Sequence, residues 1–139
     1  MVPSGGEKRE GNSTHLVGRV ERGQARGRKL GFPTANLKVA DPESHNLQRG
    51  VYVGRATWRG EVFGAVVNIG TRPTFGEGEL TVELHLLDFS GDLYDRKLKV
   101  EIFEKLREER KFANAGELVE QIEKDIARAR VALKRISST

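Results

Sequence analysis

GVYVGRATWRGEVFGAVVNIG, residues 50–70, contains two β-like runs on either side of a tight turn at Arg59-Gly60. Val, Ile, Tyr, Phe, Trp and Thr are enriched in strands, and a two-residue link with glycine is typical of a hairpin. Four more runs flank this segment: HLVGRV (15–20), TANLKV (34–39), LTVELHLLDF (80–89) and KLKVEIFEKL (97–106). A second tight turn at Gly91-Asp92 is expected to join antiparallel neighbours. Six short strands in about ninety residues predict a closed barrel or a sandwich.

The segment after Phe112 has helical periodicity. Asn114, followed three residues later by Glu117, resembles the capping box that begins many helices. Apolar residues then recur at helical spacing: Leu118, Ile122, Ile126, Ala129 and Leu133. The pattern predicts one amphipathic helix that seals one side or end of the barrel.

Length and composition favour one domain. A chain of 139 residues, 37% of them hydrophobic, suits a single core. Residues 1–13 mix glycine, serine, asparagine and charges, so we expect a disordered leader there and a folded domain over residues 14–136. The 24 basic and 20 acidic residues give a net charge of +4, which admits anionic partners without choosing among them.

Cysteine is absent, which excludes a disulfide framework, a thiolate zinc site and thiol catalysis. A cytoplasmic location is the natural expectation. No apolar run approaches the roughly eighteen residues of a membrane helix, so we expect no membrane partner.

The candidate phosphate-binding loop is GQARGRKLG, residues 23–31, because the chain has neither a GxxxxGK[ST] loop nor a GxGxxG motif. Gly23 and Gly31 would let backbone N–H groups approach phosphate oxygens, and Arg28 would neutralise their charge. Taken alone, a glycine-rich basic span is more often a flexible turn, so the span by itself does not establish phosphate binding.

The tail of the same loop, FPTAN, carries two short oxygen-bearing side chains. Pro33 fixes the backbone, and Thr34 and Asn36 then point to one face of an extended segment. A hydroxyl and an amide oxygen suit a Mg²⁺ that brings phosphates and water as its other ligands. The alternative is that both side chains only organise a turn.

The order of motifs resembles that of the riboflavin kinase family. The likeness runs from residue 15 to residue 133 and rests on five segments: GRKLGFPTANL (27–37), GVYVG (50–54), NIGTRPTFG (68–76), VELHLLDFSGDLY (82–94) and LREERKF (106–112). One departure is Asp95, where these kinases commonly have glycine. The chain is most similar to the kinase module of bifunctional riboflavin kinase/FAD synthetases, without the adenylyltransferase module, which would be a partner.

This resemblance implies a six-stranded antiparallel Greek-key β-barrel with a C-terminal helix, acting on riboflavin and ATP with Mg²⁺ as the cofactor. It implies Thr34 and Asn36 as metal and phosphate contacts and Glu83 as the catalytic base. The loop of residues 23–31 would lie over the nucleotide, and residues 68–75 would form a wall of the site. The substrate-binding residues expected on this basis are Gly23, Arg28, Gly31, Pro33, Thr34, Asn36, Asn68 and Arg107.

Two of these residues also have plainer interpretations. Glu83 lies on the strand face opposite Val82 and Leu84, where a carboxylate is usually just solvated. Arg107 could form a surface ion pair with Glu104 or Glu108. His85, on the same face as Glu83, is interpreted as structural.

Two other functions compete with the kinase. A barrel that binds nucleic acid without catalysis would explain the basic charge, but aromatic residues are only 6% of the chain and do not cluster on one strand as a stacking platform. We therefore expect no nucleic-acid partner. A barrel that binds flavin without turnover is disfavoured by the joint presence of Thr34, Asn36 and Glu83.

Overall fold

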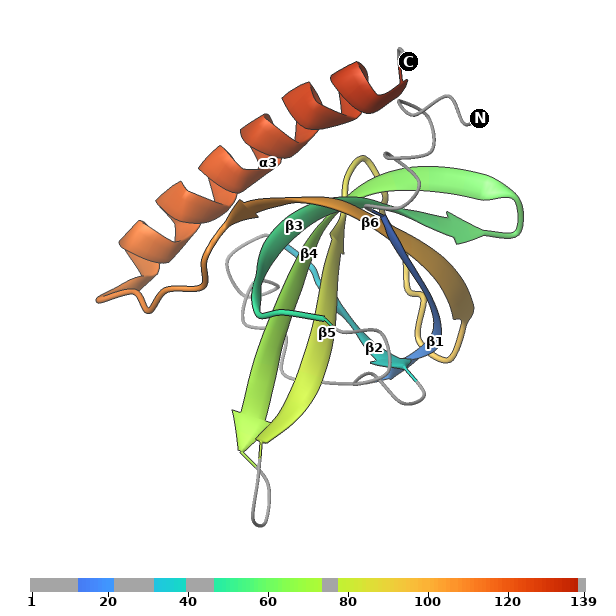
Figure 1. Ribbon diagram of the computed structural model, residues 1–139, viewed down its shortest axis with the longest axis horizontal. Helices are drawn as coiled ribbons and strands as arrows, with labels where there is room; N and C mark the ends of the chain where they lie inside the picture. The colour runs from blue at the N-terminus through green and yellow to red at the C-terminus, as the bar shows by residue number, and fades with distance from the viewer. Residues whose placement is uncertain (1–12, 22–31, 40–46, 74–77, 138–139) are drawn as a thin grey trace, which may run out of the picture.

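The computed structural model describes residues 13–21, 32–39, 47–73 and 78–137. Its elements are β1 (Thr14–Glu21), β2 (Ala35–Val39), β3 (Gly50–Trp58), β4 (Glu61–Pro73), β5 (Gly78–Leu86), β6 (Lys97–Arg107) and α3 (Ala115–Ser137). The strands close into an antiparallel barrel in the order β1-β2-β5-β4-β3-β6 (Figure 1). Strands β3, β4 and β5 form a meander, and β6 returns by a longer connection to lie beside β3, which is a Greek key. Within the described residues, the predicted six-stranded Greek-key barrel with a C-terminal helix is confirmed.

The barrel core follows from the alternation of each strand. Successive side chains of a strand point to opposite faces, so every second residue is buried. The seven largest fully buried side chains are Leu16, Val53, Val67, Ile69, Leu84, Leu98 and Val100. All but Val53 belong to the barrel interior, and Val53 lies on the outer face beneath α3.

The two predicted tight turns have different outcomes. Arg59 and Gly60 have φ angles of 54° and 82°, as a type I′ hairpin requires, and they join the paired strands β3 and β4. The prediction for Gly91-Asp92 is wrong, because β5 pairs with β2 and β4 whereas β6 pairs with β1 and β3. The connection from β5 to β6 instead reaches β1, where the Asp95 N–H donates to the Val20 carbonyl oxygen at 2.8 Å.

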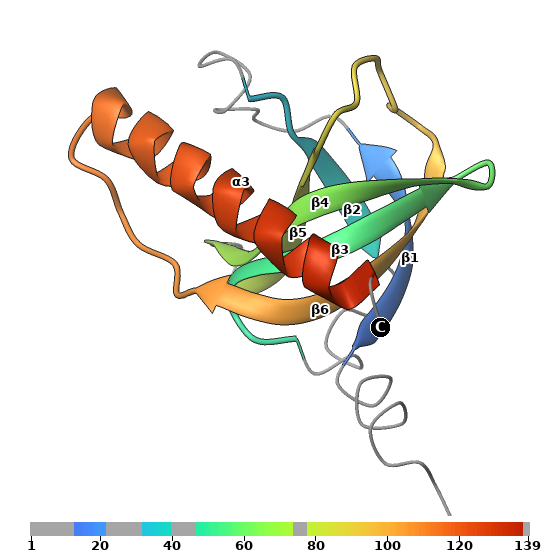
Figure 2. The same ribbon diagram turned by 90° about the horizontal axis from the view of Figure 1, so that it is seen from above.

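Helix α3 begins at the predicted cap. The Glu117 N–H donates to Asn114 Oδ1 at 2.9 Å, and Glu117 Oε1 accepts from the Ala113 N–H at 3.2 Å. The helix lies across the outer face of the barrel over β3, β4 and β6 (Figure 2). Among the described helices, none combines the length and apolar character needed to cross a membrane.

A second apolar cluster holds α3 on the sheet. Val53, Leu87, Ala129 and Ala132 are its buried members. Gly64 of β4 lies directly under the helix, and a Cβ there would be 2.5 Å from Leu133 Cδ1. The helix therefore packs against bare backbone at this point of the sheet, which confirms that it seals one side of the barrel.

Candidate active site

Strand pairing places three of the predicted site residues in one row. Asn36 of β2 lies opposite Glu83 of β5, and Glu83 lies opposite Asn68 of β4. Side chains opposite each other in an antiparallel pair are about 5 Å apart at Cβ. All three face out of the barrel, because their chain neighbours Leu37 and Leu84 are buried inside it. The proximity of Asn36 and Glu83 is therefore a consequence of the sheet register.

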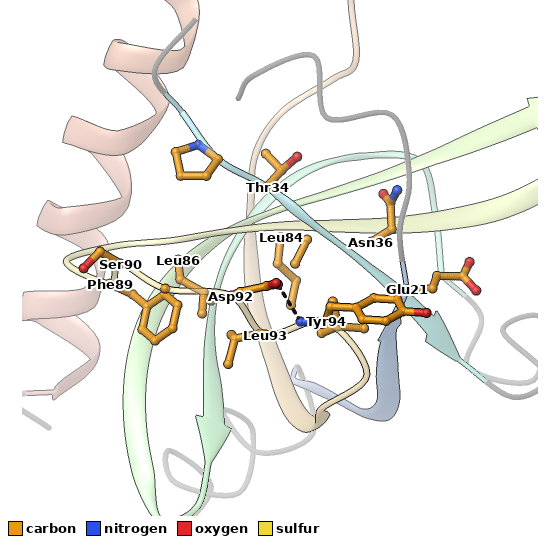
Figure 3. Close-up of a pocket in the computed structure, with 14 residues that line it drawn as sticks. Glu21, Thr34, Asn36, Leu84, Leu86, Phe89, Ser90, Asp92, Leu93 and Tyr94 are labelled. Carbon is orange, nitrogen blue, oxygen red and sulfur yellow. Dashed lines mark hydrogen bonds between the residues drawn. The ribbon is translucent and has the colours of Figure 1, made fainter. Parts of the chain in front are cut away.

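Thr34 and Asn36 project to the same side of the chain, as predicted (Figure 3). The segment before β2 is tied to β5 by His85, whose Nδ1 is 2.8 Å from the Pro33 carbonyl oxygen. Phe32 stacks edge-on against the His85 ring with centroids 6.0 Å apart. These contacts support a structural role for His85, because they fix Thr34 relative to Glu83.

Three cavities meet at these residues. The first, which we call the helix-side pocket, has a volume of about 500 Å³ and lies between the barrel, α3 and the segment of residues 108–112. Apolar side chains form one part of its wall: Phe32, Val51, Val66, Phe112, Leu118, Ile122 and Ile126. Polar and charged side chains form the rest: Arg107, Glu109, Arg110, Lys111, Asp125 and His85, with Glu83, Asn68 and Thr34 at the polar end on the barrel side. A cavity that combines apolar walls with convergent polar groups is typical of a small-molecule site.

The second cavity, the loop-side pocket, has a volume of about 210 Å³ (Figure 3). Thr34 and Asn36 line it on one side, and the connection from Phe89 to Tyr94 lines it on the other. The third, the sheet groove, is about 840 Å³ in volume and runs over the outer face of β2, β5 and β4. Thr34 borders the first two cavities, and Glu83 and Asn68 border the helix-side pocket and the sheet groove.

Arg107 is held by a buried ion pair that the sequence did not predict. Its Nε and Nη2 atoms donate to Asp125 Oδ1 and Oδ2, both at 2.8 Å, and the side chains are only 17% and 4% exposed. Gln121 Nε2 also donates to Asp125 Oδ1, at 2.9 Å. Both members of the pair line the helix-side pocket.

The interpretation of Arg107 as the surface partner of Glu104 or Glu108 is wrong. Glu104 is paired with Arg135, and Glu108 is paired with Lys105 at 2.7 Å, which raises the pKa of that lysine. Arg107 lies at the end of β6 with its guanidinium turned toward α3, where it pairs with the buried carboxylate of Asp125. The guanidinium also lies 5.8 Å from the centre of the Phe112 ring.

Asn68 has an unusual feature for a residue on a barrel wall. Its Oδ1 atom is buried and has no hydrogen-bond partner among the residues that the structure describes. A buried acceptor without a donor costs free energy, so such an atom calls for a ligand or water that donates to it. Its position beside Glu83 places this acceptor where a hydroxyl group of a ligand could donate.

Metal ligation at this site would use neutral oxygens. Among the described residues, no group of three or more His, Cys, Asp or Glu side chains could hold a metal ion. Thr34 and Asn36 offer a hydroxyl and an amide oxygen, which fit a Mg²⁺ that arrives with a nucleotide's phosphates. The predicted residues Gly23, Arg28 and Gly31 lie outside the described residues.

Two residues that line these cavities were not predicted from the sequence. Asp125 lies three residues after Ile122 and four before Ala129, so helical periodicity places it on the apolar stripe. A carboxylate on a buried stripe signals a cationic partner, and this signal was available. Glu109, which lines both the helix-side pocket and the sheet groove, gave no comparable signal.

Comparison with known proteins adds independent findings. The Flavokinase (riboflavin kinase) family model matches residues 10–133. The chain is 44% identical over 115 residues to an RNA-binding riboflavin kinase of Bacillus subtilis (strain 168), covering 82% of this chain and 49% of that protein. It is 43% identical over 125 residues to a bifunctional riboflavin kinase/FMN adenylyltransferase of Pseudomonas fluorescens, covering 89% of this chain and 40% of that protein. The chain thus spans half or less of these relatives.

Solved structures show the same likeness. Riboflavin kinase from Trypanosoma brucei is 27% identical with a TM-score of 0.66, and the match covers 88% of this chain and 81% of that one. A Streptococcus pneumoniae structure described as a macrolide-efflux protein is 31% identical with a TM-score of 0.77, covering 84% of this chain and 38% of that one. The barrel and helix are therefore shared with proteins whose sequences have diverged considerably.

Proposed function

This chain belongs to the riboflavin kinase family, and from that premise we propose that it transfers the γ-phosphate of ATP to the 5′-hydroxyl of the ribityl chain of riboflavin, giving FMN and ADP. The observation that carries the proposal is the position of Glu83. Its carboxylate lies at the polar end of the helix-side pocket and, in the sheet register, directly beside Asn36. One carboxylate therefore borders both an apolar pocket and a candidate phosphate site.

The flavin ring is assigned to the helix-side pocket. An isoalloxazine ring is flat, with an apolar dimethylbenzene side and a polar pyrimidine side, and the pocket's combination of apolar and polar side chains suits it. With the ring among these side chains, the ribityl chain would extend toward Glu83 and Asn68. The orphaned Asn68 Oδ1 would then accept a hydrogen bond from a ribityl hydroxyl.

Glu83 is proposed as the general base. It would accept the proton of the 5′-hydroxyl while that oxygen attacks the γ-phosphorus, and the bond from the γ-phosphorus to the β,γ-bridging oxygen would break to release ADP. A carboxylate that merely faced solvent would not need a neighbouring pocket. Burial of Leu84 and Val82 on the opposite face fixes the direction in which Glu83 points.

The phosphate end is assigned to Thr34 and Asn36. Their oxygens would hold Mg²⁺ together with the nucleotide, and the bound ion would neutralise charge on the transferring phosphate. The hydrogen bond between the Pro33 carbonyl oxygen and His85 holds the segment that carries Thr34 and Asn36 against β5, the strand of Glu83. The proposal also assigns Gly23, Arg28 and Gly31 to a loop over the nucleotide, as their motif implies.

A nucleic-acid module without catalysis is the less favoured alternative, since the kinase family model spans most of the chain. We further propose a cytoplasmic location, which the absence of cysteine supports. An adenylyltransferase would be a natural partner, because bifunctional relatives combine the two activities in their names.

The proposal is tested by incubating the protein with riboflavin and MgATP and separating the flavins and nucleotides by chromatography. FMN and ADP should form in equal amounts, and omission of either ATP or Mg²⁺ should abolish both. Riboflavin binding without FMN would support the flavin-binding barrel instead. Failure to bind riboflavin at all would contradict the assignment of the helix-side pocket.

A further inference from the structure

Gly70 of β4 lacks a side chain for a reason unrelated to its backbone. The described glycines with positive φ are Gly50, Gly60 and Gly91, so Gly70 adopts a conformation open to any residue. A Cβ at Gly70 would lie 2.8 Å from Glu109 Oε2 and 3.3 Å from Thr81 Oγ1. A side chain at this position would therefore compete with the carboxylate of Glu109 for the same space.

The ion pair that Glu109 forms contributes little to the stability of the fold. Arg49 is its ion-pair partner at 3.8 Å, with side chains 61% and 36% exposed. Pairs of this kind contribute at most about 1 kcal/mol and are screened by salt. Gly70 leaves room for the Glu109 carboxylate, although the ion pair with Arg49 is weak. This combination indicates that the carboxylate has a role other than stabilising the fold.

Its location defines what it could bind. Gly70 is two residues beyond Asn68 on the same face of β4, a separation of roughly 7 Å along a strand. Glu109 thus lies next to the Glu83 and Asn68 row and borders both the helix-side pocket and the sheet groove. A carboxylate accepts hydrogen bonds and cannot donate them, and it repels phosphate. Its ligand must therefore offer hydrogen-bond donors or positive charge, and the hydroxyl groups of a sugar alcohol are such donors.

We propose that Glu109 is a specificity-determining residue that accepts hydrogen bonds from the secondary hydroxyls of the ribityl chain, and that Gly70 leaves room for it to do so. The inference rests on the proposed function, because it places the flavin ring in the helix-side pocket. Ribose hydroxyls of a nucleotide share the same chemistry. The ribityl chain is favoured because it must pass from the apolar wall to Glu83, and Glu109 lines that pocket.

The test compares riboflavin with lumiflavin, which has the same ring system but a methyl group in place of the ribityl chain. Dissociation constants for both flavins are measured by flavin fluorescence with the unmodified protein, Glu109→Ala, Glu109→Gln and Gly70→Ala. A hydrogen bond to a charged group corresponds to about tenfold or more in affinity. Glu109→Ala should weaken riboflavin binding by at least that factor and leave lumiflavin binding unchanged, with Glu109→Gln intermediate.

Gly70→Ala is the second arm, because the atom it would displace is the free end of a flexible side chain. Gly70→Ala should weaken riboflavin binding as Glu109→Ala does, and the thermal unfolding midpoint should stay unchanged. The double variant Gly70→Ala/Glu109→Ala should bind riboflavin no more weakly than either single variant. Glu108→Ala is the matched control, since Glu108 is 79% exposed and pairs with Lys105.

Several results would overturn the inference while leaving the kinase proposal intact. Equal weakening of riboflavin and lumiflavin would mean that Glu109 only holds the segment in place. A raised Michaelis constant for ATP alone would assign Glu109 to the nucleotide ribose, and unchanged affinities would leave it without a role. If the unmodified protein bound neither flavin, the proposed function itself would fail.

Discussion

Replacing Asp125 with asparagine should destabilise the domain and loosen the helix-side pocket. The carboxylate is 4% exposed and accepts two 2.8 Å hydrogen bonds from Arg107, which is 17% exposed. Removing one member of a buried pair costs about 3–5 kcal/mol, because the other charge stays buried. Asparagine keeps one acceptor oxygen, so the lower end, about 3 kcal/mol, is expected. In a domain of this size that corresponds to roughly 10 °C in Tm.

Another Arg–Asp pair, in which the arginine also donates through two nitrogens, provides the control. Arg130 donates to Asp88 through two nitrogens at 2.9 and 3.0 Å, and this pair also joins α3 to the barrel, but its side chains are 49% and 74% exposed. Geometry is thus matched while burial differs. Asp88→Asn should cause only a small loss, and that loss should shrink further in high salt.

The assay is urea unfolding of both variants, followed by steady-state kinetics. Asp125→Asn should raise the Michaelis constant for riboflavin more than that for ATP, because Asp125 and Arg107 line the helix-side pocket. The reasoning is refuted if Asp125→Asn loses no more stability than Asp88→Asn. It is also refuted if the two Michaelis constants rise equally.

Three further predictions concern other parts of the molecule. Thr34→Ala and Asn36→Ala should each reduce turnover at limiting Mg²⁺ while riboflavin binding survives, and unchanged turnover would contradict the metal assignment. Gly64→Val should cost about 1–3 kcal/mol by pushing Leu133 away from β4, as urea unfolding would show. The hydrogen bond from Arg130 lowers the pKa of Asp88 below its usual 3.8. The pair should therefore stabilise the fold above that pH and lose its effect as the pH falls through the lowered pKa. If the unmodified protein remained more stable than Asp88→Asn in stronger acid, this prediction would be contradicted.

Most strands were predictable because they alternate apolar and polar residues around one buried face, whereas β3 is buried on both faces. Val82, Leu84 and Leu86 are buried and Glu83 and His85 are not, as the alternation indicated. The link from β5 to β6 was not predictable in the same way. Gly91-Asp92 has the composition of a hairpin turn, but the pairing of β6 is decided by β1 and β3, which are remote in sequence.

The sequence predicted which residues belong to the site better than it predicted how they are arranged. Thr34, Asn36, Glu83 and Asn68 came from motifs, yet only the register of β2, β5 and β4 shows that three of them form a row. The Arg107 partner was missed because residues 18 apart in sequence meet only once α3 folds back over the barrel. Glu109 depends on a missing side chain at Gly70, which no local pattern encodes.

Turnover of Glu83→Gln at saturating riboflavin and MgATP tests the central claim most directly. Glutamine keeps the size and one acceptor oxygen but removes the basicity, so the variant should fold and bind both substrates normally. A positioned base contributes a factor on the order of 10² to 10⁴, and the loss of turnover should lie in that range. A rate within about threefold of the unmodified protein would contradict the assignment of Glu83 as the base that accepts the proton of the flavin hydroxyl.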